Sequence, residues 1–247
     1  KKLYNSSFEH DACGIGAIAN IDGRYEHKTI DDALRMLENM EHRGGTGADP
    51  ETGDGAGILF QLNPEMIKLL TDDAEINADE NKPLGIGMFF LPNIKSVAKE
   101  CLSVLEKNAQ ELKLHIIGYR NVPVDSKVPG VGAKPVEPSV KQVFIQSQEE
   151  LTEAELERKL FVLRNCATHQ IANEIKANNK GFYFCSLSCR KITYKGQLRT
   201  EQLREYYRDL QDERFKTAFA IIHSRFSTNT FPNWKLAQPF HFIAHNG

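Results

Sequence analysis

The sequence has no long hydrophobic segment and no excess of charge of one sign. No apolar run approaches the roughly 18 residues that a transmembrane helix needs, so no membrane-spanning helix and no membrane partner are predicted. Residues 1–12 lack the apolar core of a secretory signal. Lysine and arginine number 31 and aspartate and glutamate 33, a formal charge of −2. This balance gives no support to a nucleic-acid partner.

Cysteine is scarce, and repeats and linkers are missing. Five cysteines, an odd number, in a chain of 247 residues are not typical of a disulfide framework. They indicate reduced thiols and predict a cytoplasmic location. We find no internal repeat, no low-complexity segment and no linker rich in proline, glycine or serine. A chain of this length that is 40% hydrophobic is therefore expected to form one globular domain.

Hydrophobic periodicity predicts interspersed strands and helices without strict alternation, which favours an α+β fold over a parallel α/β fold. Strands are predicted at residues 13–20, 57–62, 84–91, 115–120, 140–147, 182–187, 191–194, 217–223 and 240–245. Helices are predicted at residues 30–40, 94–112, 152–177 and 200–207. The pair 182–187 and 191–194 suggests a hairpin. Residues 121–139 carry four prolines and no clear period, so we expect a long loop there.

Cys13 opens the first predicted strand and is followed by small residues. If processing cuts the chain after Ala12, Cys13 acquires a free α-amine beside its thiol. An α-amine has a pKa of about 7.7–8.0 and can take the thiol proton at neutral pH. Cys13 would then be a self-contained nucleophile and base. The alternative is a small buried cysteine, which this segment by itself favours.

Three further segments carry groups suited to a catalytic or binding site. Arg43 lies in a glycine-rich loop after a predicted helix, where the alternative is a helix end with a solvated arginine. Arg225 and Thr228 follow an apolar strand and could hold a carboxylate, or could belong to a surface loop. Asn246 and Gly247 offer a side-chain amide next to a backbone N–H, as an oxyanion hole requires, although Asn-Gly is also the strongest hairpin signal.

A zinc site is a weaker alternative. Cys185 and Cys189 have a spacing seen in metal ligands, and Cys166 and His169 add two more donors. The first pair lies in a predicted hairpin with apolar neighbours, and the second pair lies on a predicted helix. We therefore favour core thiols and predict no metal site.

Taken together, the motifs resemble those of the class II, N-terminal-nucleophile glutamine amidotransferases. Longer strings resemble the glutaminase domain at the start of the large subunit of glutamate synthase, and the resemblance runs along nearly the whole chain. These strings are residues 8–14 (FEHDACG), 41–44 (EHRG), 52–57 (TGDGAG), 185–188 (CSLS), 194–196 (YKG) and 225–232 (RFSTNTFP).

The resemblance implies a role for each candidate residue. Cys13 would attack the side-chain amide carbon of L-glutamine, with its own α-amine as the general base. Asn246 and Gly247 would hold the oxyanion. Arg225 and Thr228 would bind the substrate α-carboxylate. Arg43 would lie beside the nucleophile and organise the site.

The resemblance also implies an αββα four-layer sandwich, present here as a partial domain. Residues 1–12 would be a propeptide and residues 13–247 a C-terminally incomplete amidotransferase domain. The released ammonia would serve synthase domains of the same polypeptide. FMN and an iron–sulfur cluster are expected in those domains and no cofactor in this chain, with an electron-donating small subunit or ferredoxin as partner.

Two alternative functions stay open, and the predicted processing has one consequence for the unprocessed chain. The chain could be another N-terminal-nucleophile hydrolase that acts on a different amide, or a non-catalytic metal-binding module built on Cys185 and Cys189. With residues 1–12 still attached, the nitrogen of Cys13 is an amide and cannot accept a proton. We therefore expect an unprocessed chain to be inactive.

Overall fold

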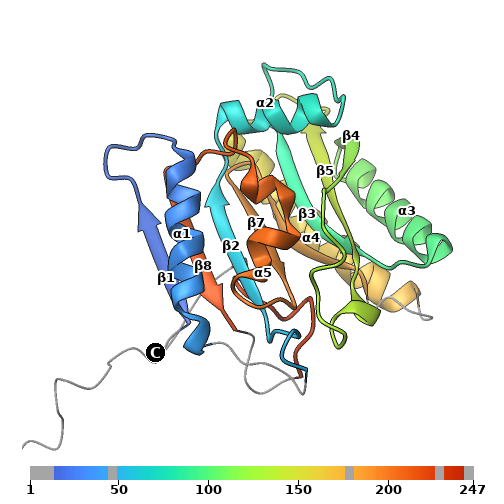
Figure 1. The fold of residues 1–247 in the computed structure, drawn as a ribbon. Coiled ribbons are helices and arrows are strands. Elements are labelled where there is room, and N and C mark those ends of the chain that lie inside the picture. The colour runs from blue at the N-terminus through green and yellow to red at the C-terminus, as the bar shows by residue number, and fades with distance from the viewer. Residues whose placement is uncertain (1–13, 44–48, 176–180, 226–230, 242–247) are drawn as a thin grey trace, which may run out of the picture.

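The computed structural model describes residues 14–43, 49–175, 181–225 and 231–241 (Figure 1). Two four-stranded antiparallel sheets form the centre, with strand orders β1-β8-β2-β7 and β4-β5-β3-β6. The strands of the first sheet are β1 (Ile15–Ala19), β2 (Ala56–Gln61), β7 (Lys191–Gly196) and β8 (Phe219–Ser224). Those of the second are β3 (Gly85–Leu91), β4 (Leu114–Asn121), β5 (Ser139–Ser147) and β6 (Tyr183–Ser188).

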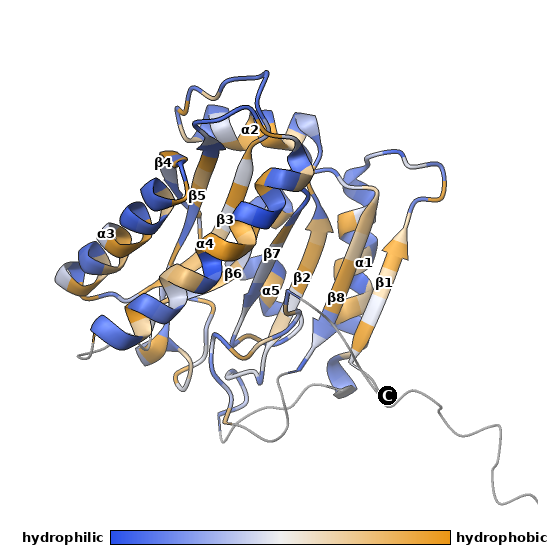
Figure 2. Cartoon of the chain, turned by 180° about the vertical axis from the view of Figure 1, so that it is seen from behind, coloured by the Kyte–Doolittle hydropathy of each residue, from blue (hydrophilic) through white to orange (hydrophobic). Residues whose placement is uncertain are grey.

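Helices lie on both sides of the strands. The α-helices are α1 (His27–Asn39), α2 (Pro64–Asp73), α3 (Lys95–Glu111), α4 (Glu153–Glu174) and α5 (Gln202–Tyr206). The short 3-10 helices are η1 (Glu41–Arg43), η2 (Lys134–Val136) and η4 (Arg208–Gln211). Buried residues of α1, α2 and α5 share one hydrophobic cluster with strands of both sheets. Helices α3 and α4 pack on the opposite side of the second sheet (Figure 2). This mixed architecture confirms the α+β, N-terminal-nucleophile fold class.

Local sequence explains the main elements. Ile30, Leu34 and Leu37 recur at helical spacing and form the buried side of α1. Thr152 caps α4 through a capping box with Glu155, which satisfies two backbone N–H groups at the helix start. All residues of β3 are buried, because this strand pairs on both edges and is covered on both faces.

Three expectations need correction. Helix α2 was not predicted, although Asn63 caps it and Pro64 begins it, both regular helix-start signals. The predicted hairpin of residues 182–194 is wrong: β6 pairs with β3 and β7 pairs with β2, so the two strands belong to different sheets. The strand expected from Phe240 does not include Phe240 or His241, and its other residues lie outside the described ranges.

Within the described ranges, none of the helices is both long and apolar enough to cross a membrane.

Candidate active site

One edge of the first sheet gathers the residues around the predicted nucleophile. Antiparallel pairing places the start of β1, the end of β8 and the start of β2 at the same edge, through the pairs Ile15 with His223 and Ala56 with Ser224. The backbone N–H of Ser224 donates to the carbonyl of Gly14 at 2.6 Å. A Cβ atom on Gly14 would overlap the Ser224 carbonyl, so glycine is required for this approach. The residue that follows Cys13 is thus fixed against the end of β8.

Arg225 follows directly and lies at this edge in an unusual conformation. Its φ of 115° falls in a region that side-chain-bearing residues rarely adopt. Its backbone N–H donates to the Gly55 carbonyl at 2.7 Å, which ties it to the turn before β2. Such strained positions cluster at binding and catalytic sites. The Arg225 side chain is exposed, and its backbone follows the Ser224 residue that is bonded to Gly14 at the start of β1.

The turn before β2 adds an acidic group to this edge. Burial raises the pKa of Asp54 above its usual value, and the nearby Arg225 guanidinium partly opposes that shift. Gly55 has a φ of 141°, which glycine adopts without strain. A Cβ on Gly55 would contact Ala237 at 3.1 Å, so this turn also packs against the segment that leads to residues 242–247.

Residues 233–241, which we call the C-terminal strap, cross the face of the first sheet. A Cβ on Gly57 would overlap the Gln238 carbonyl, so the strap backbone lies directly on β2. The Nζ atom of Lys195 in β7 donates to the carbonyls of Lys235 and Ala237. His241 lies with its Nε2 atom 3.1 Å from the Phe184 carbonyl, at the other end of the strap.

Most predicted catalytic and substrate-binding residues lie outside the described ranges. These are Cys13, Thr228, Asn246 and Gly247. For Arg43, the structure gives the backbone only, as the last residue of η1. The described neighbours of the predicted site are therefore Gly14, Arg225 and the strap. Their meeting at one sheet edge is what the geometry contributes, and the roles of the other residues stay predictions.

The remaining cysteines occupy two kinds of position. Cys185 and Cys189 are buried, and desolvation raises the pKa of the Cys185 thiol to about 12. They are core thiols, as predicted. Cys166 is exposed on α4, so it does not belong to the core. In the described part of the chain, no group of three His, Cys, Asp or Glu side chains is arranged to hold a metal ion.

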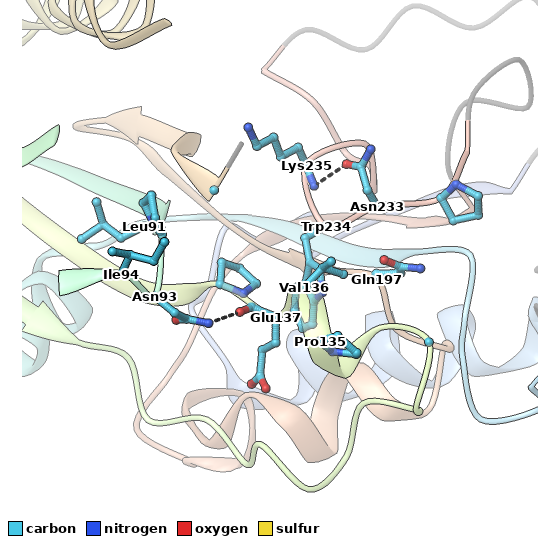
Figure 3. A pocket seen from close by; sticks show the side chains of 15 residues that line it. Leu91, Asn93, Ile94, Pro135, Val136, Glu137, Gln197, Asn233, Trp234 and Lys235 are labelled. Atoms are coloured by element: carbon cyan, nitrogen blue, oxygen red, sulfur yellow. Dashed lines mark hydrogen bonds between the residues drawn. The ribbon is translucent and has the colours of Figure 1, made fainter. Parts of the chain in front are cut away.

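A pocket of about 650 Å³ lies at the end of β3, and Asn233, Trp234 and Lys235 of the strap line part of it (Figure 3). Asn93, Glu137, Gln197 and Trp234 contribute to its wall, and Asn93 donates to the Glu137 carbonyl at 2.6 Å. The Glu137 carboxylate is turned to Ser126, Lys134 and Tyr206 instead. Arg225 does not line this pocket, so we do not assign the predicted chemistry to it.

One polar residue of this region received no role from the sequence. Lys195 lies within the string of residues 194–196 that carries the resemblance, yet its burial was not foreseen. Its side chain is fully buried, which is rare for lysine. The available signal was its place in a predicted strand region, directly after Tyr194 and two residues after Thr193, both buried.

Comparison with known proteins identifies the family of the chain. Residues 13–247 match the family model described as glutamine amidotransferases class-II. The chain is 42% identical to the NADPH glutamate synthase large chain of Bacillus subtilis, over 99% of this chain and 16% of that protein. It is 39% identical to ferredoxin-dependent glutamate synthase 2 of Synechocystis, over 97% of this chain and 15% of that protein.

A eukaryotic relative is equally similar. The NADH glutamate synthase of Saccharomyces cerevisiae is 41% identical over 99% of this chain and 12% of that protein. The chain thus spans about one sixth or less of the length of these relatives. Because the family model covers nearly all residues, the chain belongs to the class-II glutamine amidotransferases.

Proposed function

We propose that this chain hydrolyses L-glutamine to glutamate and ammonia, with Cys13 as the nucleophile. The observation that carries the proposal is the family match, which begins at residue 13. A domain whose first residue is the nucleophile should begin there. The contact of Gly14 with the end of β8 supports it, because it fixes the start of β1 beside Arg225.

The proposed reaction has two stages. The Cys13 α-amine takes the thiol proton, and the thiolate attacks the glutamine side-chain amide carbon. The tetrahedral intermediate collapses to a thioester as the amide nitrogen, protonated by the same amine, leaves as ammonia. Water, deprotonated by the α-amine, then hydrolyses the thioester to glutamate and restores the thiol.

Two groups would stabilise the negative charge that develops on the amide oxygen. The Asn246 side-chain amide and the Gly247 backbone N–H are proposed as oxyanion donors. Removal of one such donor lowers kcat by about 100–1,000-fold in other acyl-transfer enzymes.

Arg225 and Thr228 would select the substrate by its α-carboxylate. A guanidinium can bind a carboxylate through two parallel hydrogen bonds, and a threonine hydroxyl can add a third. The exposed position of Arg225 next to the start of β1 supports this assignment. Arg43 is proposed to lie beside the nucleophile and organise the site.

Processing would switch this activity on. While residues 1–12 are attached, the nitrogen of Cys13 is part of a peptide bond and cannot act as a base. We therefore propose that residues 1–12 are a propeptide and that the unprocessed chain is inactive. The domain assignment of residues 13–247 rests on the same argument.

The relatives suggest the wider context. Proteins named as NADPH, NADH and ferredoxin-dependent glutamate synthases contain a segment like this chain. We propose that the ammonia feeds a glutamate synthase reaction in domains outside this chain. FMN, an iron–sulfur cluster and an electron-donating subunit or ferredoxin would belong to those domains, and the protein would be cytoplasmic.

The proposal is tested by ammonia release from L-glutamine by the full-length polypeptide and its Cys13→Ala variant. The variant should release no ammonia above background, while glutamate synthesis from added ammonia should persist. Intact mass after glutamine addition and acid quenching should show the glutamyl thioester only when Cys13 is present. Equal glutaminase activity in both proteins would exclude Cys13 as the nucleophile. Hydrolysis of other amides but not of glutamine would favour a different N-terminal-nucleophile hydrolase.

A further inference from the structure

Lys195 is a buried cation with no acidic partner among the residues that the structure describes. It is fully buried in β7, and none of the ion pairs among the described residues includes it. Burial of an unpaired ammonium is strongly unfavourable unless its hydrogen-bonding capacity is satisfied. A methionine would fill a similar volume without that penalty. The ammonium group must therefore be retained for the contacts that it makes.

Those contacts bind the C-terminal strap. The Lys195 Nζ atom donates to the Ala237 carbonyl at 2.7 Å, to the Lys235 carbonyl at 3.0 Å and to the Tyr183 hydroxyl at 3.2 Å. All three ammonium protons thus have acceptors. The ammonium also lies 4.7 Å from the centre of the Phe240 ring and 4.5 Å from that of Tyr183. Three of these five interactions reach the strap.

The pairing register of the first sheet connects Lys195 to the start of β1, next to the predicted nucleophile. Lys195 pairs with Gly57, Gly57 pairs with His223, and His223 pairs with Ile15. Directly paired residues of antiparallel strands present their side chains on the same face. The strap lies on that face, over Gly57. The row of directly paired residues that begins at Lys195 therefore ends at Ile15, two residues after Cys13 in the sequence.

The strap also leads in sequence to the proposed oxyanion donors. His241 is five residues before Asn246, so chain length limits the distance between them to roughly 18 Å. Lys191 adds a second contact from β7, with its Nζ atom 3.3 Å from the His241 carbonyl. The position of the strap on the sheet therefore restricts where the residues after it can reach.

We propose that Lys195 is a positioning residue of the amidotransferase site. It clamps the C-terminal strap to the sheet and thereby sets the register in which the chain delivers Asn246 and Gly247 to the substrate amide. This inference rests on the proposed function. It assigns Lys195 no contact with substrate.

The test compares Lys195→Met with wild type in the full-length, processed polypeptide. Loss of the Lys195 contacts to the strap should lower kcat for glutamine hydrolysis by about 10–100-fold. In other enzymes, a misplacement of catalytic groups by about 1 Å has an effect of this size. KM should stay within about 3-fold, because the Arg225 backbone is held directly by the Gly55 carbonyl and Lys195 makes no contact with Arg225. Alkylation of Cys13 by iodoacetamide should proceed at the wild-type rate, because this reaction needs the thiolate but no oxyanion donor.

Lys159→Met is the matched control. Lys159 also donates to a backbone carbonyl, that of Leu112 at 2.9 Å, and it lies on α4 away from the strap. It should leave kcat within about 2-fold of wild type, since lost hydrogen bonds far from the site act on stability only. Phe240→Leu removes the aromatic ring beside the ammonium group but keeps Lys195, and it should lower kcat with KM unchanged. This variant replaces Lys195→Met in the test if Lys195→Met does not fold.

Three outcomes would overturn the inference. The first is a wild-type kcat in a Lys195→Met variant that folds. The second is a wild-type kcat in Phe240→Leu, where Lys195→Met does not fold. The third is a fall in kcat that is matched by an equal fall in the alkylation rate of Cys13. Activity that survives Cys13→Ala would instead overturn the proposed function, so the two failures are distinguishable.

Discussion

At the scale of the residue, the sheet edge is shaped by positions that admit only one kind of side chain. Gly14 and Gly57 lack the Cβ atoms that would overlap the backbones of Ser224 and Gln238. Arg225 holds a strained φ of 115° and is fixed through its backbone to Gly55. These contacts hold the Arg225 backbone, and the Arg225 side chain is exposed.

Replacement of Arg225 should weaken glutamine binding. Because a hydrogen bond to a charged group contributes about 1.5–3 kcal/mol, Arg225→Ala should raise KM by roughly 10–100-fold with a smaller effect on kcat. Arg225→Lys should restore only part of the loss, since an ammonium lacks the planar fork. Steady-state kinetics with glutamine measures both.

The matched control is Arg208→Ala, which removes an exposed arginine paired with Asp125 at 3.4 Å. It should leave KM unchanged. An unchanged KM in Arg225→Ala as well would remove Arg225 from the substrate site.

His241 should make the strap sensitive to acid. Burial, with the positive charges of Arg164, Lys195 and Lys191, lowers the pKa of His241 to about 3. The unfolded chain, with a histidine pKa near 6.5, then binds more protons between pH 6.5 and 3, so stability is lost as the pH falls through that window. His241→Gln keeps an N–H donor for the Phe184 carbonyl but does not titrate there.

Urea midpoints of wild type and His241→Gln at pH 7 and pH 5 measure this effect. The wild type should lose more stability between the two pH values than the variant does. An identical loss in both proteins would show that His241 is not the acid-sensitive group.

At the scale of the element, sequence patterns predicted the strands and long helices but not their partners. The periodicity of Ile30, Leu34 and Leu37 is local and correctly predicted α1. The pairing of β6 and β7 depends on which sheet edge each strand finds, and no local pattern encodes that. Helix α2 carried its start signals in Asn63 and Pro64, so it could have been predicted.

The sequence predicted the site as a set of separate motifs, but it did not predict how these motifs are arranged in space. Residue types suited to a thiol nucleophile and a carboxylate clamp are visible in Cys13 and Arg225. The resemblance to a family supplied their joint role. The adjacency of Gly14, Ser224 and Gly55 arises from strand register, and the burial of Lys195 depends on the strap that covers it. Neither property has a local signal.

The β1–β8 pairing should be sensitive to Gly14→Ala. The added methyl group overlaps the Ser224 carbonyl, so we expect a loss of about 1–3 kcal/mol in the free energy of unfolding and a fall in glutaminase activity. Ala17→Gly is the control, because Ala17 is an exposed residue of the same strand. It should lower stability by only about 0.5–1 kcal/mol and keep the activity. Equal effects of the two substitutions, measured by urea unfolding, would contradict the proposed close contact.

At the scale of the whole molecule, two sheets with helices on both sides hold the proposed catalytic edge, which is assembled from distant parts of the sequence. The start of β1, the end of β8, the turn before β2 and the C-terminal strap meet there. The family assignment is the basis for the chemistry that we propose for this edge. The central claim is that cleavage before Cys13 creates the base as well as exposing the nucleophile.

That claim is tested most directly by ammonia release from L-glutamine by two full-length proteins, one that begins at Cys13 and one that retains residues 1–12. Because positioned general-base catalysis contributes about 100–10,000-fold, the protein that begins at Cys13 should be faster by at least about 100-fold. Intact mass must show that each N-terminus persists through the assay. Equal rates from the two proteins would contradict the account.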